Sequence, residues 1–223
     1  MEFEAITLEE KQQALSDLED VKEQLTARGQ LPAASGSLSV RVGDYRPSKF
    51  YFAVTAQQDA REKSRLPSRG LFLFADSTGS PCHSTLLLPS DDAPLHAKLY
   101  RITGCTAIIH AHTVFASVLG DYYGDNGYIR AQGLELIKQL GIWEKTAEAR
   151  IPVLSSNGSI SAIAKQLPQV VDTRMPGLIL RGGGLYAWGD GIHQAKLRLE
   201  AMEFILEAQY RSLLLPAKPY PGK

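Results

Sequence analysis

Two histidines separated by one residue are the residues of this chain whose types and spacing most directly suggest a functional site. His110 and His112 close the run 106–113, which reads Thr-Ala-Ile-Ile-His-Ala-His-Thr and is apolar and β-branched before the pair. Alternate side chains of a β-strand point to the same face, so both imidazoles are expected to project together. Two imidazoles on one face can bind a divalent metal, or they can be hydrogen-bonded core or surface histidines. The pair alone supports both interpretations about equally.

Three further stretches carry groups that can bind an anion or move a proton. The small and hydroxyl residues at 33–39 form a loop that can aim backbone N–H groups at an anion, although a plain glycine turn has the same composition. Ser90 and Asp92 stand at the expected start of a helix, where they either cap it or face a ligand. Glu135 is either catalytic or solvent-exposed, and by composition alone solvent exposure is the better interpretation.

Composition and charge limit the function classes. The chain has 223 residues, and lysine plus arginine equals aspartate plus glutamate at 24 each, so no basic excess points to nucleic acid or an acidic membrane as partner. No apolar run reaches the length of a membrane span, and the acidic start Met-Glu-Phe-Glu is not a secretory signal. Cys82 and Cys105 are too few for a disulfide scaffold or a cysteine zinc site, and are expected to be buried fillers. The expected compartment is the cytoplasm.

The elements that must position these groups follow from periodicity, caps and breakers. Thr7 and Glu10 fit a capping box that opens the first helix. The last helix is amphipathic, with an expected apolar stripe of Leu197, Ala201, Ile205 and Ala208. We expect one domain over residues 1–223, with a loose tail at 216–223. Helices are expected at 7–28, 90–101, 113–119, 132–140, 158–167 and 192–214, and strands at 38–42, 50–55, 71–75, the stretch ending in the histidine pair, 151–154, 177–180 and 185–188.

The order of these elements resembles the class II aldolase family over about residues 31–206. This resemblance implies an α/β fold of three layers, α/β/α, with a central, largely antiparallel sheet. It is carried by five stretches, at residues 34–39 (Ala-Ser-Gly-Ser-Leu-Ser), 89–92 (Pro-Ser-Asp-Asp), 109–112 (Ile-His-Ala-His), 133–135 (Gly-Leu-Glu) and 184–189 (Gly-Leu-Tyr-Ala-Trp-Gly).

The resemblance also implies a chemistry. In the family, zinc is held by the His-x-His pair and a third histidine, so it implies that His110 and His112 are zinc ligands. It implies that Glu135 is the general acid/base, and the segment after it is most similar to dehydratases that eliminate water from a 2-keto sugar phosphate. Zinc would act as Lewis acid on the carbonyl, and Glu135 would protonate the departing hydroxyl, which needs a raised pKa.

Substrate-binding positions and assembly are implied in the same way. Gly36, Ser37 and Ser90 match phosphate-contacting positions, and Asp92 takes the place of a substrate-facing glutamate of aldolases or a cysteine of some dehydratases. The expected partner is a small sugar-phosphate substrate. The family is usually tetrameric, with sites near subunit boundaries, so a homo-oligomer is implied.

One position departs from the family pattern. The third zinc histidine is expected where this chain has Gly183, and catalytic zinc normally takes three protein ligands. His193 is a weak substitute candidate, and His83 and His96 are no better supported. Three functions therefore stay open: the dehydratase, another zinc-dependent sugar-phosphate aldolase or epimerase, and a non-catalytic relative used for assembly or binding. The Glu135 segment favours the first and Gly183 favours the third, and the first is the preferred function because Glu135 and the paired histidines are kept.

Overall fold

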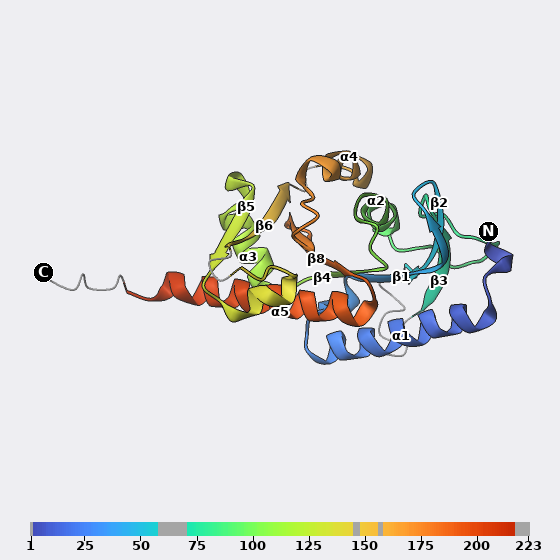
Figure 1. Cartoon of the computed structure of the whole chain (residues 1–223), viewed down its shortest axis with the longest axis horizontal. Coiled ribbons are helices and arrows are strands. Elements are labelled where there is room, and N and C mark those ends of the chain that lie inside the picture. The colour runs from blue at the N-terminus through green and yellow to red at the C-terminus, as the bar shows by residue number, and fades with distance from the viewer. Residues whose placement is uncertain (1, 58–70, 145–147, 156–157, 217–223) are drawn as a thin grey trace, which may run out of the picture.

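One eight-stranded sheet runs through the molecule. The computed structural model describes residues 2–57, 71–144, 148–155 and 158–216 (Figure 1). Within them the strand order is β3-β2-β1-β4-β8-β7-β6-β5, and every neighbouring pair is antiparallel except β6 and β7. The strands are β1 (Ser37–Arg46), β2 (Lys49–Thr55), β3 (Phe72–Asp76), β4 (Ala107–Ala111), β5 (Tyr128–Gln132), β6 (Glu148–Ser155), β7 (Gly177–Arg181) and β8 (Gly184–Gly189).

Helices cover both faces of this sheet. Figure 1 shows α2 and α4 on one side and α1 and α5 on the other. The α-helices are α1 (Leu8–Ala27), α2 (Ala93–Thr103), α3 (Val114–Tyr122), α4 (Ile160–Val170) and α5 (Ile192–Leu214). Short 3-10 helices are η1 (Phe3–Ala5), η2 (Pro32–Ala34), η3 (Gly124–Asn126) and η4 (Glu135–Leu140). The expected three-layer α/β/α arrangement with a largely antiparallel sheet is confirmed.

The central strand β4 is apolar on both faces because each face packs on a helical layer. Ile109 belongs to the core shared with α1, α3 and α5, whereas its neighbour Ile108 belongs to the core shared with α2 and α4. His110 follows the same alternation and points to the side of α2 and α4. A strand buried on both faces holds its last side chains rigidly, which suits it to carry a site.

Several sequence predictions are confirmed at the level of local interactions. Thr7 and Glu10 form the reciprocal capping box at the start of α1. Helix α5 spans the residues expected for it. Thr113 caps α3 through its side chain, which accepts from the backbone of Ala116. These features depend on residues three or four apart, so the sequence could show them.

Other predictions were wrong. The helix expected at 132–140 is the shorter 3-10 helix η4 (Glu135–Leu140), and the edge strand β5 that precedes it, whose side chains alternate between buried and exposed, was not predicted. Helix α4 does not end before Pro168 but continues to Val170. The apolar stripe of α5 was only partly right: Ala201 and Ile205 are buried, but Leu197 is 52% exposed, and Leu199 and Met202 are buried in its place.

Two observations complete the comparison with the sequence. Apart from Pro216, the tail expected at 216–223 lies outside the described residues. In the ranges that the structure covers, no helix has both the length and the apolar character needed to cross a bilayer.

Candidate active site

The two histidines lie side by side at the end of β4. Their ring centroids are 4.7 Å apart, so both rings project to the same side, as the alternation of a strand requires. His110 is buried, whereas His112 is half-buried. β4 runs between β1 and β8, where His110 stands opposite Ser37 on one side and opposite Tyr186 on the other.

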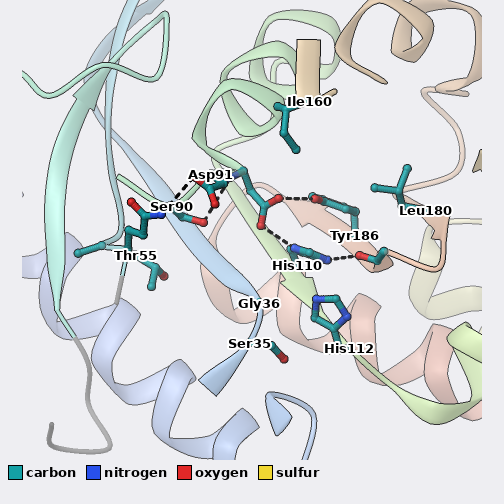
Figure 2. A pocket seen from close by; sticks show the side chains of 14 residues that line it. Ser35, Gly36, Thr55, Ser90, Asp91, His110, His112, Ile160, Leu180 and Tyr186 are labelled. Carbon is teal, nitrogen blue, oxygen red and sulfur yellow. Dashed lines mark hydrogen bonds and ion pairs between the residues drawn. The ribbon is translucent and has the colours of Figure 1, made fainter. Parts of the chain in front are cut away.

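A cavity of about 420 Å³ opens beside the rings (Figure 2). Five of the seven residues expected at the site line it, namely Gly36, Ser90, Asp92, His110 and His112. The structure brings these together from the loop before β1, the start of α2 and the end of β4. Gly183, where the third zinc histidine was expected, also lines the cavity, and so do residues that were not predicted as site residues: Ser35, Thr55, Ala56, Gln57, Asp91, Ile160, Leu180 and Tyr186.

The carboxylate of Asp92 holds three donors at the base of the cavity. Its Oδ2 accepts from Nδ1 of His110 at 2.7 Å and from the Ser37 hydroxyl at 2.9 Å, and its Oδ1 accepts from the Tyr186 hydroxyl at 3.1 Å. Burial raises the pKa of Asp92, but the hydrogen bond and charge of His110, together with His96 and Ser37, outweigh it and hold that pKa well below its ordinary value. Asp92 is therefore ionised.

Asp92 rather than Ser90 occupies the N-cap position of α2, which corrects the helix start expected from the sequence. Its side chain makes no cap hydrogen bond, because both carboxylate oxygens are used at the cavity. The Ser90 hydroxyl accepts from the backbone N–H of Asp92 at 3.3 Å. The carboxylate expected to face the substrate is thus turned toward His110.

The ring of His110 is fixed at every polar atom. It stacks on Tyr186, with centroids 4.1 Å apart and planes inclined by 5°. Its Nε2 lies 2.5 Å from the carbonyl oxygen of Gly183. A carbonyl can only accept, so Nε2 donates to it, and Nδ1 faces the carboxylate of Asp92. Neither ring nitrogen offers a free lone pair to the cavity in this arrangement.

A chain of buried hydrogen bonds continues behind Asp92. Ser37 Oγ lies 3.1 Å from Nε2 of His96, Ser39 Oγ lies 2.7 Å from Nδ1 of His96, and the Tyr100 hydroxyl lies 2.6 Å from Ser39 Oγ. Ser37 must donate to Asp92, which only accepts, so Nε2–H of His96 donates to Ser37. Nδ1 then accepts from Ser39, and Ser39 accepts from Tyr100.

This chain explains two properties of its members. Ser37 is fully buried and its hydroxyl is occupied, so the structure places it behind the cavity and not at a phosphate position. Burial lowers the pKa of His96 from 6.5 to about 4, with the nearby charge of Asp92 opposing and that of His110 adding to this effect. His96 is neutral, as its direction in the chain requires, and both of its ring nitrogens are used, so it does not replace the missing zinc histidine.

The loop before β1 forms the opposite wall. Gly36 has φ +85°, and a Cβ there would collide with the backbone oxygen of His110, so only glycine allows this close approach. The hydroxyl oxygen of Ser35 is buried and has no hydrogen-bond partner in the described part of the chain. Because Ser35 lines the cavity, a turn of its side chain would bring this unpartnered hydroxyl to a ligand. Sequence reasoning found the loop but not this residue.

Glu135 does not reach this cavity. It lies on η4, which packs against α5 on the other side of the sheet. Its side chain is 82% exposed and forms an ion pair of 2.6 Å with Lys138. The residue expected to act as general acid/base thus lies outside the cavity of its own chain. Its exposure agrees with the interpretation that composition favoured.

The described residues do not complete a three-ligand metal centre. All five histidines of the chain are described, and besides the pair they are distant or occupied. His83 lies against Phe3, His96 uses both ring nitrogens, and His193 is exposed at the start of α5. Among the described residues, no group of three His, Cys, Asp or Glu side chains is placed to hold a metal ion. The donor set therefore does not fit the expected zinc centre.

The third histidine of the expected centre is replaced by Gly183, which offers only its carbonyl oxygen. The two cysteines do not replace it. Burial raises the pKa of both Cys82 and Cys105 to about 12, so neither is a thiolate at neutral pH. Both behave as the buried fillers expected from the sequence, although Cys82 is only partly buried.

Known proteins share both the sequence pattern and the fold. Residues 16–210 match the family model described as Class II Aldolase and Adducin N-terminal domain. A methylthioribulose-1-phosphate dehydratase of Persephonella marina is 34% identical over 89% of this chain and 90% of its own, and one of Bacillus subtilis is 35% identical over 87% and 91%. The structure of an L-fuculose-1-phosphate aldolase from Thermus thermophilus covers 91% of this chain and 96% of its own, with a TM-score of 0.67 and 22% identity.

Proposed function

The chain belongs to the class II aldolase and adducin family, and from that premise we propose that it is a methylthioribulose-1-phosphate dehydratase of methionine salvage. The observation that carries the proposal is the similarity of nearly the whole chain to dehydratases of this name. The enzyme is a carbon–oxygen lyase. A cavity that combines hydroxyl groups, two imidazoles and apolar side chains supports this assignment.

The reaction removes water from a 2-keto sugar phosphate. A proton leaves C3, next to the C2 carbonyl, and the hydroxyl group leaves C4 with a proton as water. The resulting enol rearranges to 2,3-diketo-5-methylthiopentyl 1-phosphate. Catalysis therefore needs a base at C3, an acid at the C4 oxygen and a group that polarises the C2 carbonyl.

The two walls of the cavity suit the two ends of this substrate. Ser35, Gly36 and Ser90 lie on the side of the loop before β1 and the start of α2, where hydroxyl and backbone N–H groups can bind the phosphate (Figure 2). Ile160 and Leu180 lie on the other side and can contact the apolar methylthio end. This direction would place the keto and hydroxyl groups between the walls, beside His110 and His112.

In this proposal Asp92 is a positioning residue. It holds Nδ1 of His110 and the Tyr186 hydroxyl, and Ser37 holds Asp92 in turn. His110 is thereby kept in one orientation, at no further cost when substrate binds. His112 has the more accessible ring and can contact the substrate oxygens directly.

Glu135 can act as the general acid/base only if a second copy of the chain brings it to the cavity. Its exposed position on η4 leaves it free to enter a neighbouring subunit. We therefore link two expectations from the sequence, the catalytic glutamate and the homotetramer.

Enzymes of this family generally use a divalent metal, and zinc is the metal we propose to test. His110 and His112 are the residues that would hold it, and bound zinc would polarise the substrate carbonyl. The donor set, however, does not complete a three-ligand centre among the described residues. We place the protein in the cytoplasm, in agreement with its composition.

The test is a lyase assay with 5-methylthioribulose 1-phosphate, with product masses recorded and zinc measured in protein purified without chelator. Formation of the diketone with loss of one water supports the proposal, and carbon–carbon cleavage or an unchanged substrate overturns it. Mixing Glu135→Gln protein with His112→Ala protein tests the shared site. Subunit exchange should restore part of the activity if Glu135 acts in a neighbour, and no activity should return if it does not.

A further inference from the structure

We infer that Gly183 and Leu180 keep the metal site of this chain at two protein ligands, so that it binds zinc weakly. Zinc binding can be measured without substrate and therefore separately from the proposed reaction. Residue 183 lines the cavity, and its carbonyl oxygen lies 2.5 Å from Nε2 of His110. A ligating side chain at this position would stand beside the imidazole pair.

The backbone at Gly183 does not require glycine. Its neighbours Gly182 and Gly184 have φ of +71° and +95°, a region that residues with a side chain rarely adopt. Gly183 is not among the described residues with positive φ. A larger residue at 183 is therefore compatible with the conformation of the turn, and the absence of a side chain there has another cause.

That cause is the side chain of Leu180. A Cβ added at Gly183 would lie 2.7 Å from Cδ2, 2.9 Å from Cγ and 3.2 Å from Cβ of Leu180. Atoms this close must move, and Leu180 is only 6% exposed and packs in the core shared with α2 and α4. Leu180 thus occupies the space that a third ligand at 183 would need.

The turn that contains Gly183 also opposes the binding of a metal ion through His110. Its Nε2 donates to the carbonyl oxygen of Gly183, so a metal could use this nitrogen only after that hydrogen bond is broken. Asp92 cannot compensate, because its carboxylate already accepts from His110, Ser37 and Tyr186. The site therefore has two imidazoles, one of which must be released before it can ligate.

The experiment shortens the side chain at Leu180 and adds an imidazole at Gly183 in one protein. In the double variant Leu180→Ala/Gly183→His, zinc affinity should rise by on the order of 10²–10³-fold over the natural chain. The matched control, Leu180→Ala/Gly183→Ala, changes the same space without adding a ligand, and its affinity should stay within a few-fold of the natural chain. Affinity is measured by competition with a chromophoric chelator, and Co²⁺ absorption reports on the ligand set.

Adding His112→Ala to the double variant should abolish the gain, because the new imidazole must work with the pair. An unchanged affinity in the folded double variant, checked by its thermal unfolding, would overturn the inference. So would an equal gain in the alanine control. The natural chain provides a test that needs no variant to fold, since its zinc dissociation constant should be micromolar or weaker. A nanomolar constant would show that another residue completes the site.

Discussion

Acid should destabilise this protein through the buried His96. Burial lowers the pKa of the His96 imidazole to about 4 in the folded chain, compared with 6.5 for an exposed histidine. Between these two pH values the His96 imidazole is protonated in the unfolded chain and neutral in the folded chain, so the free energy of unfolding falls as the pH falls. The contribution is complete above about pH 6.5 and is lost progressively toward pH 4.

The size of the effect follows from the same two values. One pKa unit corresponds to about 1.4 kcal/mol, so lowering the pH from 7 to 5 should remove about 2 kcal/mol of stability through His96 alone. The structural reason is the direction of the hydrogen-bond chain. A second proton on His96 would set Nδ1–H against the hydroxyl hydrogen of Ser39 and reverse the chain up to Tyr100.

The assay compares the natural chain with His96→Gln by urea unfolding at pH 7 and pH 5, in the presence of a chelator. Glutamine has an NH2 group that can donate to Ser37 and a carbonyl oxygen that can accept from Ser39, so it can keep the direction of the chain without titrating. It should cost about 1–3 kcal/mol at pH 7 through altered packing. The difference between the two proteins should then shrink by about 2 kcal/mol at pH 5, whereas parallel pH profiles would refute the reasoning.

Three further outcomes are expected at the candidate active site. Asp92→Asn should lower the free energy of unfolding by about 2–4 kcal/mol and reduce kcat, because it removes the charge that strengthens the hydrogen bonds from His110 and Tyr186. Urea unfolding and turnover measure this, and unchanged stability would contradict it. Ser35→Ala should raise KM by about tenfold with little change in kcat if its hydroxyl binds the phosphate. An equal loss of turnover with the phosphorylated substrate and with an analogue that lacks the phosphate would argue against that contact. Glu135→Gln should slow turnover by about 10²–10⁴-fold without changing zinc content, and full activity would remove Glu135 from the mechanism.

The parts of the fold that depend on nearby residues could be predicted from the sequence. The capping box of Thr7 and Glu10 joins residues three apart, and the long helix α5 shows its apolar face every three or four residues. The projection of His110 and His112 to one side needs only the alternation of a strand. The resemblance to a family supplied the layers and the sheet, which no local pattern contains.

The edge strand β5 shows where local reasoning ended. Residues 132–140 contain good helix formers, and their composition favours a helix. In the structure only Gln132 of this range belongs to β5, which pairs with β6, and Gly133 with φ +76° separates the strand from the 3-10 helix η4. Local propensity therefore indicated a helix here, but the pairing of β5 with β6 keeps the chain extended up to Gln132 and shortens that helix. Glu135 stays exposed on η4, away from the cavity.

The arrangement within the site depends on contacts between distant parts of the chain. Sequence reasoning named Asp92 and His110, but their hydrogen bond follows from the packing of α2 over β4, and Tyr186 joins them because β8 pairs with β4 in one register. Strand register and helix packing decide which side chains meet, and neither can be read from the spacing of residues along the chain. The residue types thus indicated a metal and phosphate chemistry and, at Gly183, the loss of one ligand, whereas the packing of the strands decided that Asp92 and the carbonyl oxygen of Gly183 already engage both ring nitrogens of His110.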